Sequence, residues 1–119
     1  MGSVSEPHPD STETEWLTVE DVARRLAVSP GRVRRMLDEG QLVGSRRGGR
    51  IAVPGVFLVE DQVLGSLRGT LFVLRDAGFT DDEAIDWLLA PEETLGVAPV
   101  DALRRGRTRE VRRLAKVLA

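Results

Sequence analysis

The sequence predicts a mainly α-helical protein with one small β-hairpin, and three observations lead to this fold class. Two helix-start signals lie close together between residues 17 and 40, and the second is followed by a cluster of arginines. An arginine- and glycine-rich segment, residues 44–51, then separates two short apolar stretches, which is typical of a hairpin. Further helix-start signals recur through the C-terminal half.

The first helix is expected to begin after Thr18. Threonine is a good N-cap, and Asp21 places a carboxylate near the free amides of the first turn. One apolar stripe at helical spacing is formed by Val19, Val22, Ala23 and Leu26. Val28 is an apolar residue in the break that follows, and we expect it to pack under the turn.

The second helix is predicted over about residues 29–39. Ser29 is a good N-cap, Pro30 suits the first helical position, and Gly40 can end the helix in a left-handed conformation. The apolar face of this helix is formed by Val33, Met36 and Leu37. At 100° per residue the opposite face carries Gly31, Arg34, Arg35 and Asp38, with Arg32 on the flank.

The hairpin is expected to pair Leu42-Val43 with Ile51–Val53 around a tip at Ser45–Arg50. Gly48-Gly49 permits a tight turn with positive φ. The tip reads Arg46-Arg47-Gly-Gly-Arg50. It places three positive charges close together, and this repulsion is unfavourable in a turn that has only a structural role.

Charge is strongly segregated along a chain whose net charge is only −2. Residues 16–53 carry net +4, residues 54–100 carry net −7, and residues 101–119 carry net +5. A polyanion responds to the local patch, because electrostatic screening acts over about 8–10 Å at physiological salt. A slightly acidic chain can therefore still present a basic face.

Helix, turn, helix and hairpin in this order are what a winged helix-turn-helix needs for binding double-stranded DNA. Arginines on an amphipathic helix often form only its solvated face, but here they recur on two elements that this fold brings together. We expect the second helix in the major groove and the wing, residues 44–51, on the backbone. The predicted DNA-binding residues are Ser29, Arg32, Arg34, Arg35, Arg46, Arg47 and Arg50.

Residues 17–53 resemble the winged helix-turn-helix of excisionase-type and MerR-type DNA-binding domains. The wider chain is similar to a small actinobacterial family in which a winged helix precedes its own C-terminal helical domain. The blocks that carry this resemblance are Pro54-Gly-Val-Phe-Leu, Leu67-Arg-Gly-Thr-Leu, Leu74-Arg-Asp-Ala-Gly-Phe-Thr-Asp-Asp-Glu-Ala, Trp87-Leu, Pro99-Val-Asp-Ala-Leu-Arg and Arg109-Glu-Val-Arg-Arg-Leu-Ala. The resemblance covers about residues 16–119 and implies DNA binding and transcriptional regulation.

Several helices are predicted in the C-terminal half. Thr70 can cap a helix that stops at Gly78, and Thr80 with Glu83 forms a capping box for the next helix. Its apolar face includes Trp87, which we interpret as a core residue. Pro99 opens a short helix through Leu103. In the last helix, capped by Thr108, the inward stripe is formed by Val111, Leu114, Ala115 and Leu118.

The segment Trp87-Leu-Leu-Ala-Pro-Glu-Glu-Thr-Leu-Gly…Pro99-Val-Asp-Ala-Leu-Arg is similar to the toxin-binding segment of Xre/ParS-type antitoxins. Residues 80–119 could therefore bind a toxin or another protein partner, or could be a shared helical module used for packing or dimerisation. The basic last helix is either a solvated face, a source of extra phosphate contacts or a surface for an acidic patch on a second subunit. An architectural nucleoid protein is a further alternative, and a homodimer would suit a palindromic site.

Other function classes have little support. The chain has no cysteine, and its only histidine, His8, lies near the N-terminus, so we expect no enzyme activity, no metal site and no cofactor. No apolar run reaches about 20 residues, and residues 1–15 lack the features of a signal peptide, so we expect a cytoplasmic, nucleoid-associated protein.

Three regions follow from these patterns: an acidic disordered tail at residues 1–15, a winged helix-turn-helix at 16–57 and a C-terminal helical domain at 58–119. The tail carries serine and threonine hydroxyls, and their phosphorylation would add negative charge beside the DNA-binding face.

Overall fold

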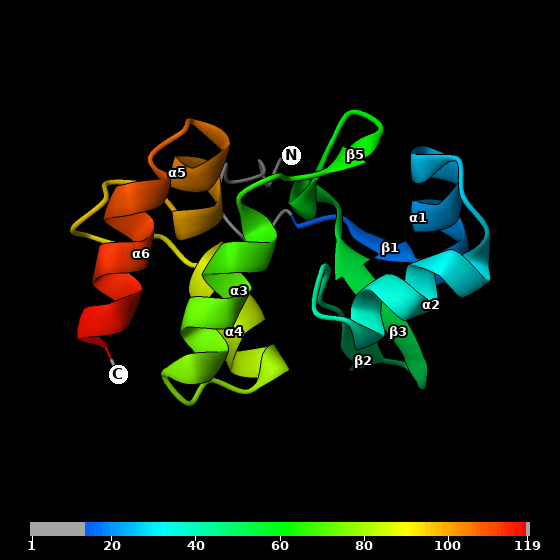
Figure 1. The fold of residues 1–119 in the computed structure, drawn as a ribbon, viewed down its shortest axis with the longest axis horizontal. Coiled ribbons are helices and arrows are strands. Elements are labelled where there is room, and N and C mark those ends of the chain that lie inside the picture. The colour runs from blue at the N-terminus through cyan, green and yellow to red at the C-terminus, as the bar shows by residue number, and fades with distance from the viewer. Residues whose placement is uncertain (1–13, 119) are drawn as a thin grey trace, which may run out of the picture.

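The computed structural model describes residues 14–118 and places the elements in two groups along the longest axis (Figure 1). The expected disordered tail lies almost wholly outside the described residues. The N-terminal group consists of β1 (Trp16–Thr18), α1 (Val19–Leu26), α2 (Pro30–Asp38), β2 (Ser45–Arg47) and β3 (Arg50–Pro54). The C-terminal group consists of α3 (Leu67–Asp76), α4 (Asp81–Leu89), α5 (Pro99–Arg104) and α6 (Thr108–Val117). A connecting segment between the two groups contains η2 (Gly55–Phe57), β4 (Leu58–Val59) and β5 (Gln62–Val63).

The wing belongs to a three-stranded antiparallel sheet with the order β1-β3-β2. The central strand pairs Val53 with Leu17 of β1 and Ile51 with Arg46 of β2. Strand β1 was not predicted, because it has only three residues and the last of them, Thr18, is also the cap of α1.

Leu42 and Val43 are not a strand, so the predicted pairing is wrong at this end of the hairpin. Both side chains are buried, whereas a two-faced strand would bury only one of two neighbours. The strand begins at Ser45, after Gly44 has passed close to β3. A Cβ on Gly44 would lie 2.9 Å from the carbonyl oxygen of Ala52, which explains why a glycine stands there.

The local cap predictions are confirmed at three helix starts. Thr18 and Thr80 each form a capping box, and the Ser29 hydroxyl accepts a hydrogen bond from the backbone N–H of Arg32 at 3.1 Å. Gly40 adopts the left-handed conformation with φ of 78°. Val28, by contrast, is 37% exposed and does not pack under the turn as expected.

Two predicted caps in the C-terminal half are wrong. Thr70 lies inside α3, fully buried, and its hydroxyl donates to the Ser66 carbonyl at 2.9 Å. A threonine inside a helix can satisfy its hydroxyl in this way, so it need not mark a helix start. Thr108 is the first residue of α6, and the N-cap position, Arg107, makes no side-chain cap bond. Leu118 lies beyond α6 and is 47% exposed, so the inward stripe ends earlier than expected.

Two arginines hold the connection between the groups. Arg25 of α1 donates twice to the Glu60 carbonyl in the β4–β5 turn, at 3.0 and 2.8 Å. Arg104 of α5 donates to the carbonyls of Val56 and Leu58, at 2.9 and 2.8 Å. The connecting segment is thus hydrogen-bonded to a helix on each side, which sets how the two groups sit.

Candidate nucleic-acid interface

Helix α2 is held by one apolar face and presents its arginines outward. Val33 is fully buried, and Met36 and Leu37 are partly buried against the core. Arg32, Arg34 and Arg35 are exposed. The Ser29 hydroxyl is occupied by the Arg32 amide, so Ser29 positions the start of the helix.

The wing turns in two residues between β2 and β3. Gly48 and Gly49 both have positive φ, 61° and 82°, as a type I′ hairpin turn requires. Side chains with a Cβ would be strained at both positions, so the glycines keep the hairpin tight. Arg46, Arg47 and Arg50 are all exposed around this turn.

Arg34, Arg46 and Arg50 come together at one concavity of about 420 Å³, which we call the α2–wing concavity. It is lined by Thr18, Val19, Glu20, Arg34, Arg46, Gly49, Arg50 and Ile51. Glu20 is the only carboxylate among these lining residues, and its Oε2 lies 3.9 Å from Arg34 Nη2. One arginine each from α2, β2 and β3 therefore faces a space with one acid.

Arg47 lies elsewhere. Its Cζ lies 4.1 Å from the centroid of the Trp16 ring, and it lines a second concavity together with Asp82 and Asp86 of α4. Neighbouring residues of a strand point to opposite faces, which separates Arg47 from Arg46. The structure thus does not group Arg47 with the other wing arginines.

Arg32 and Arg35 remain outside both concavities. Their side chains make no hydrogen bond or ion pair within residues 14–118, so both are available to an external ligand. Arg35 follows Arg34 and continues the exposed face of α2, while Arg32 lies near its N-terminus.

Glu20, which lines the α2–wing concavity, and Trp16, which lies under Arg47, were not among the predicted site residues. Glu20 stands in the first turn of α1, where acids commonly complement the helix dipole, so its position gave no separate signal of a binding site.

Asp21, in the same turn as Glu20, is part of the cap of α1. The Thr18 backbone N–H lowers the pKa of Asp21, with further contributions from the Thr18 hydroxyl and Arg24.

Other kinds of site are not seen in the described part of the chain. Residues 14–118 contain no group of three His, Cys, Asp or Glu side chains that could hold a metal ion. None of the helices described is both long and apolar enough to cross a membrane.

Comparison with known proteins gives consistent results over both halves. Residues 10–58 match the family described as DNA-binding protein Rv2175c, wHTH domain, and residues 64–119 match the Rv2175c C-terminal domain of unknown function. The DNA-binding protein Rv2175c of Mycobacterium tuberculosis is 38% identical over 111 residues, covering 82% of this chain and 76% of that protein. The NMR structure of Rv2175c superimposes with a TM-score of 0.82 at 34% identity, covering 97% of this chain and 86% of the other.

Proposed function

The chain belongs to the family of the DNA-binding protein Rv2175c, and we propose that it binds double-stranded DNA and regulates transcription in the cytoplasm, on the nucleoid. One observation carries the proposal: arginines of α2 and of the wing line the same concavity. We assign this DNA contact to the winged helix-turn-helix at residues 16–57 and treat residues 58–119 as a C-terminal helical domain.

In the proposed complex, α2 enters the major groove and the wing lies on the adjacent backbone. Arg32 and Arg35 are free to reach base edges. Arg34, Arg46 and Arg50 hold phosphates, because a guanidinium offers several donors in a fixed fork to phosphate oxygens. Neutralising three phosphates with these three arginines would give a slope of log affinity against log salt of roughly −2.7.

The double variant R46A/R50A tests this assignment. Losing two phosphate contacts should make the slope less negative by about 1.8 and weaken binding to all sequences alike. The matched control is R68A/R105A, which removes the same charge from exposed residues of the C-terminal half. Fluorescence anisotropy across a salt series measures both slopes. Equal slopes for the two variants would show that the wing is not on the DNA.

Sequence preference is tested at Arg35. If this side chain reads a base, Arg35→Ala should cost about 1–3 kcal/mol on a selected genomic fragment and much less on scrambled DNA. Equal losses on both would indicate phosphate contact alone, as in an architectural binder. Selected fragments that contain inverted half-sites about 10 base pairs apart would indicate that two copies bind together.

A further inference from the structure

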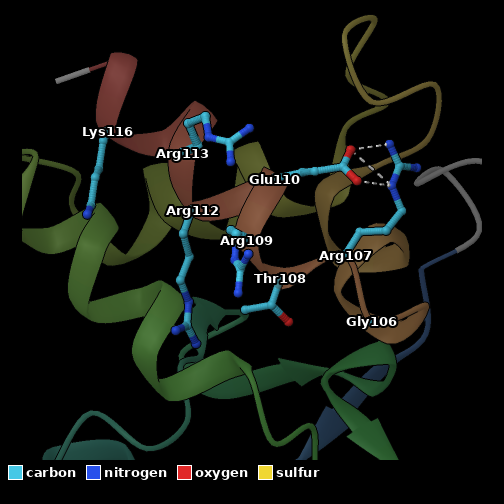
Figure 2. A pocket seen from close by; sticks show the side chains of 8 residues that line it. All are labelled: Gly106, Arg107, Thr108, Arg109, Glu110, Arg112, Arg113 and Lys116. Atoms are coloured by element: carbon cyan, nitrogen blue, oxygen red, sulfur yellow. Dashed lines mark hydrogen bonds and ion pairs between the residues drawn. The ribbon is translucent and has the colours of Figure 1, made fainter.

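Helix α6 carries a second cationic surface, which lies apart from the α2–wing concavity. Arg109, Arg113 and Lys116 are exposed on it, and we call these three residues the α6 basic surface. They border a concavity of about 840 Å³ on this helix, and Figure 2 shows them with the other residues that line it. At 100° per residue the three side chains fall within one narrow sector of the helix.

The other two arginines of this region have structural partners. Arg112 donates through Nε to the Thr70 hydroxyl at 3.2 Å and through Nη2 to the Ser66 carbonyl at 3.0 Å, which ties α6 to α3. Arg107 donates to the Glu110 carboxylate at 2.8 Å and to the Leu95 carbonyl at 3.0 Å. These contacts separate structural arginines from the α6 basic surface.

The α6 basic surface has no anionic partner of its own within residues 14–118. No carboxylate there lies within 4.0 Å of the side-chain nitrogens of Arg109, Arg113 or Lys116. Glu110 is the only acid that lines the concavity, and Arg107 already holds it (Figure 2). Arg113 acts on Glu110 only at longer range, where it helps to lower the pKa of that carboxyl after the larger effect of Arg107.

Such a cluster suits a ligand with repeated negative charges. Arg109 and Arg113 are like charges at i and i+4, a spacing that destabilises a helix by itself. An extended phosphate backbone would relieve this repulsion, because each guanidinium or ammonium group can meet a separate phosphate. A single carboxylate could neutralise only one of the three charges.

The α6 basic surface and α2 lie toward opposite ends of the longest axis, which is 45 Å long (Figure 1). The acidic first turn of α4 adjoins the N-terminal group. Asp81 forms an ion pair with Arg75. The Arg75 guanidinium in turn lies beside Gly40, just beyond α2, because a Cβ on Gly40 would lie 2.9 Å from Arg75 Nη1. Asp82 borders the concavity of Arg47. A duplex that continued from α2 toward α6 would face these carboxylates, so we assign α6 a different duplex.

We propose that the α6 basic surface binds the phosphate backbone of a second DNA duplex, so that one copy of the protein holds two duplexes together. The inference rests on the proposed function for the first duplex, which the α2–wing concavity holds. It gives the C-terminal half a role in nucleic-acid binding that depends on charge and carries no base readout.

The test is a bridging assay with the full-length protein. A biotinylated duplex on beads captures a fluorescent duplex only when the protein joins them. The variant R109Q/R113Q/K116Q keeps long helix-forming side chains but removes three charges, and the control R109K/R113K/K116R keeps all charges. We expect the first variant to reduce capture at least tenfold, with single-duplex affinity within twofold of wild type, and the control to retain capture.

Unchanged capture with R109Q/R113Q/K116Q would overturn the inference. A single-duplex salt slope that becomes less negative by about 2.7 would also overturn it, because α6 would then lie on the first duplex. Sedimentation velocity without DNA tests whether the surface binds a second copy of the protein. If wild type self-associates and the variant does not, the surface holds the acidic face of a second copy instead. Failure of the first-duplex proposal is seen separately, as unchanged single-duplex binding by R46A/R50A.

Discussion

Arg47 lies over the indole of Trp16, with its Cζ 4.1 Å from the ring centroid. This pair joins β1 to β2 across one side of the wing, next to the acids Asp82 and Asp86 of α4. The opposite side of the wing contributes Arg46 to the α2–wing concavity. Adjacent arginines thus contact different parts of the protein, so Arg46 and Arg47 should differ in their effect on DNA binding.

Arg47→Ala should leave DNA binding almost unchanged and slightly lower stability. A cation–π contact at an exposed site contributes about 0.5–1 kcal/mol. Urea unfolding should show a loss of this size, and the salt slope of DNA binding should match wild type. The paired variant Arg46→Ala should behave in the opposite way, with a flatter slope and little change in unfolding. A flatter salt slope for Arg47→Ala would contradict this prediction and show that Arg47 contacts DNA.

Glu20→Gln should strengthen DNA binding. Its carboxylate lies 3.9 Å from Arg34 Nη2 and is the only acid lining the α2–wing concavity. Removing it frees Arg34 for a phosphate, and because exposed ion pairs contribute about 0.2–1 kcal/mol, the gain should be up to about fivefold. Anisotropy at fixed salt measures the change. Glu93→Gln, which removes an exposed acid far along the chain, is the charge-matched control, and equal gains would indicate only a net-charge effect.

Arg104→Ala should destabilise the connection between the two groups. Its guanidinium donates to the carbonyls of Val56 and Leu58, which would lose these donors. We expect a loss of about 1–3 kcal/mol in the free energy of unfolding, measured by urea denaturation. Arg105→Ala is the matched control, since this exposed neighbour makes no side-chain hydrogen bond in the described chain. Similar losses for both would show that the two bonds are not important.

Stability should fall in acid through the cap of α1. The pKa of Asp21 is lowered in the folded protein by its bonds with Thr18, from an ordinary value of 3.8. A lowered folded pKa stabilises the fold above the unfolded pKa, and this stabilisation is lost as pH falls through the folded pKa. The difference in urea midpoint between wild type and Asp21→Asn should therefore be constant above about pH 5 and shrink below about pH 4. A constant difference down to pH 2 would contradict this assignment.

Short-range signals in the sequence predicted most helix starts, and the exception at Thr70 has a physical cause. Thr18, Ser29 and Thr80 cap helices because each precedes a helix whose first amides are within reach of its own hydroxyl. Thr70 has the same chemistry, but its hydroxyl is satisfied by Ser66 and Arg112 inside the packed core. One of these two partners, Arg112 of α6, lies about 40 residues away in the sequence, so no local pattern around Thr70 contains it.

The succession of helix, turn, helix and hairpin, the outward face of α2 and the glycine turn of the wing follow from the sequence by itself, because each depends on neighbouring residues. Only the tertiary structure decided which arginines act together. It brought Arg34, Arg46 and Arg50 to one space, turned Arg47 toward Trp16 and committed Arg104 and Arg112 to backbone carbonyls. A guanidinium is the same group in all these places, and its partner is chosen by the packing of distant elements, which no local pattern contains.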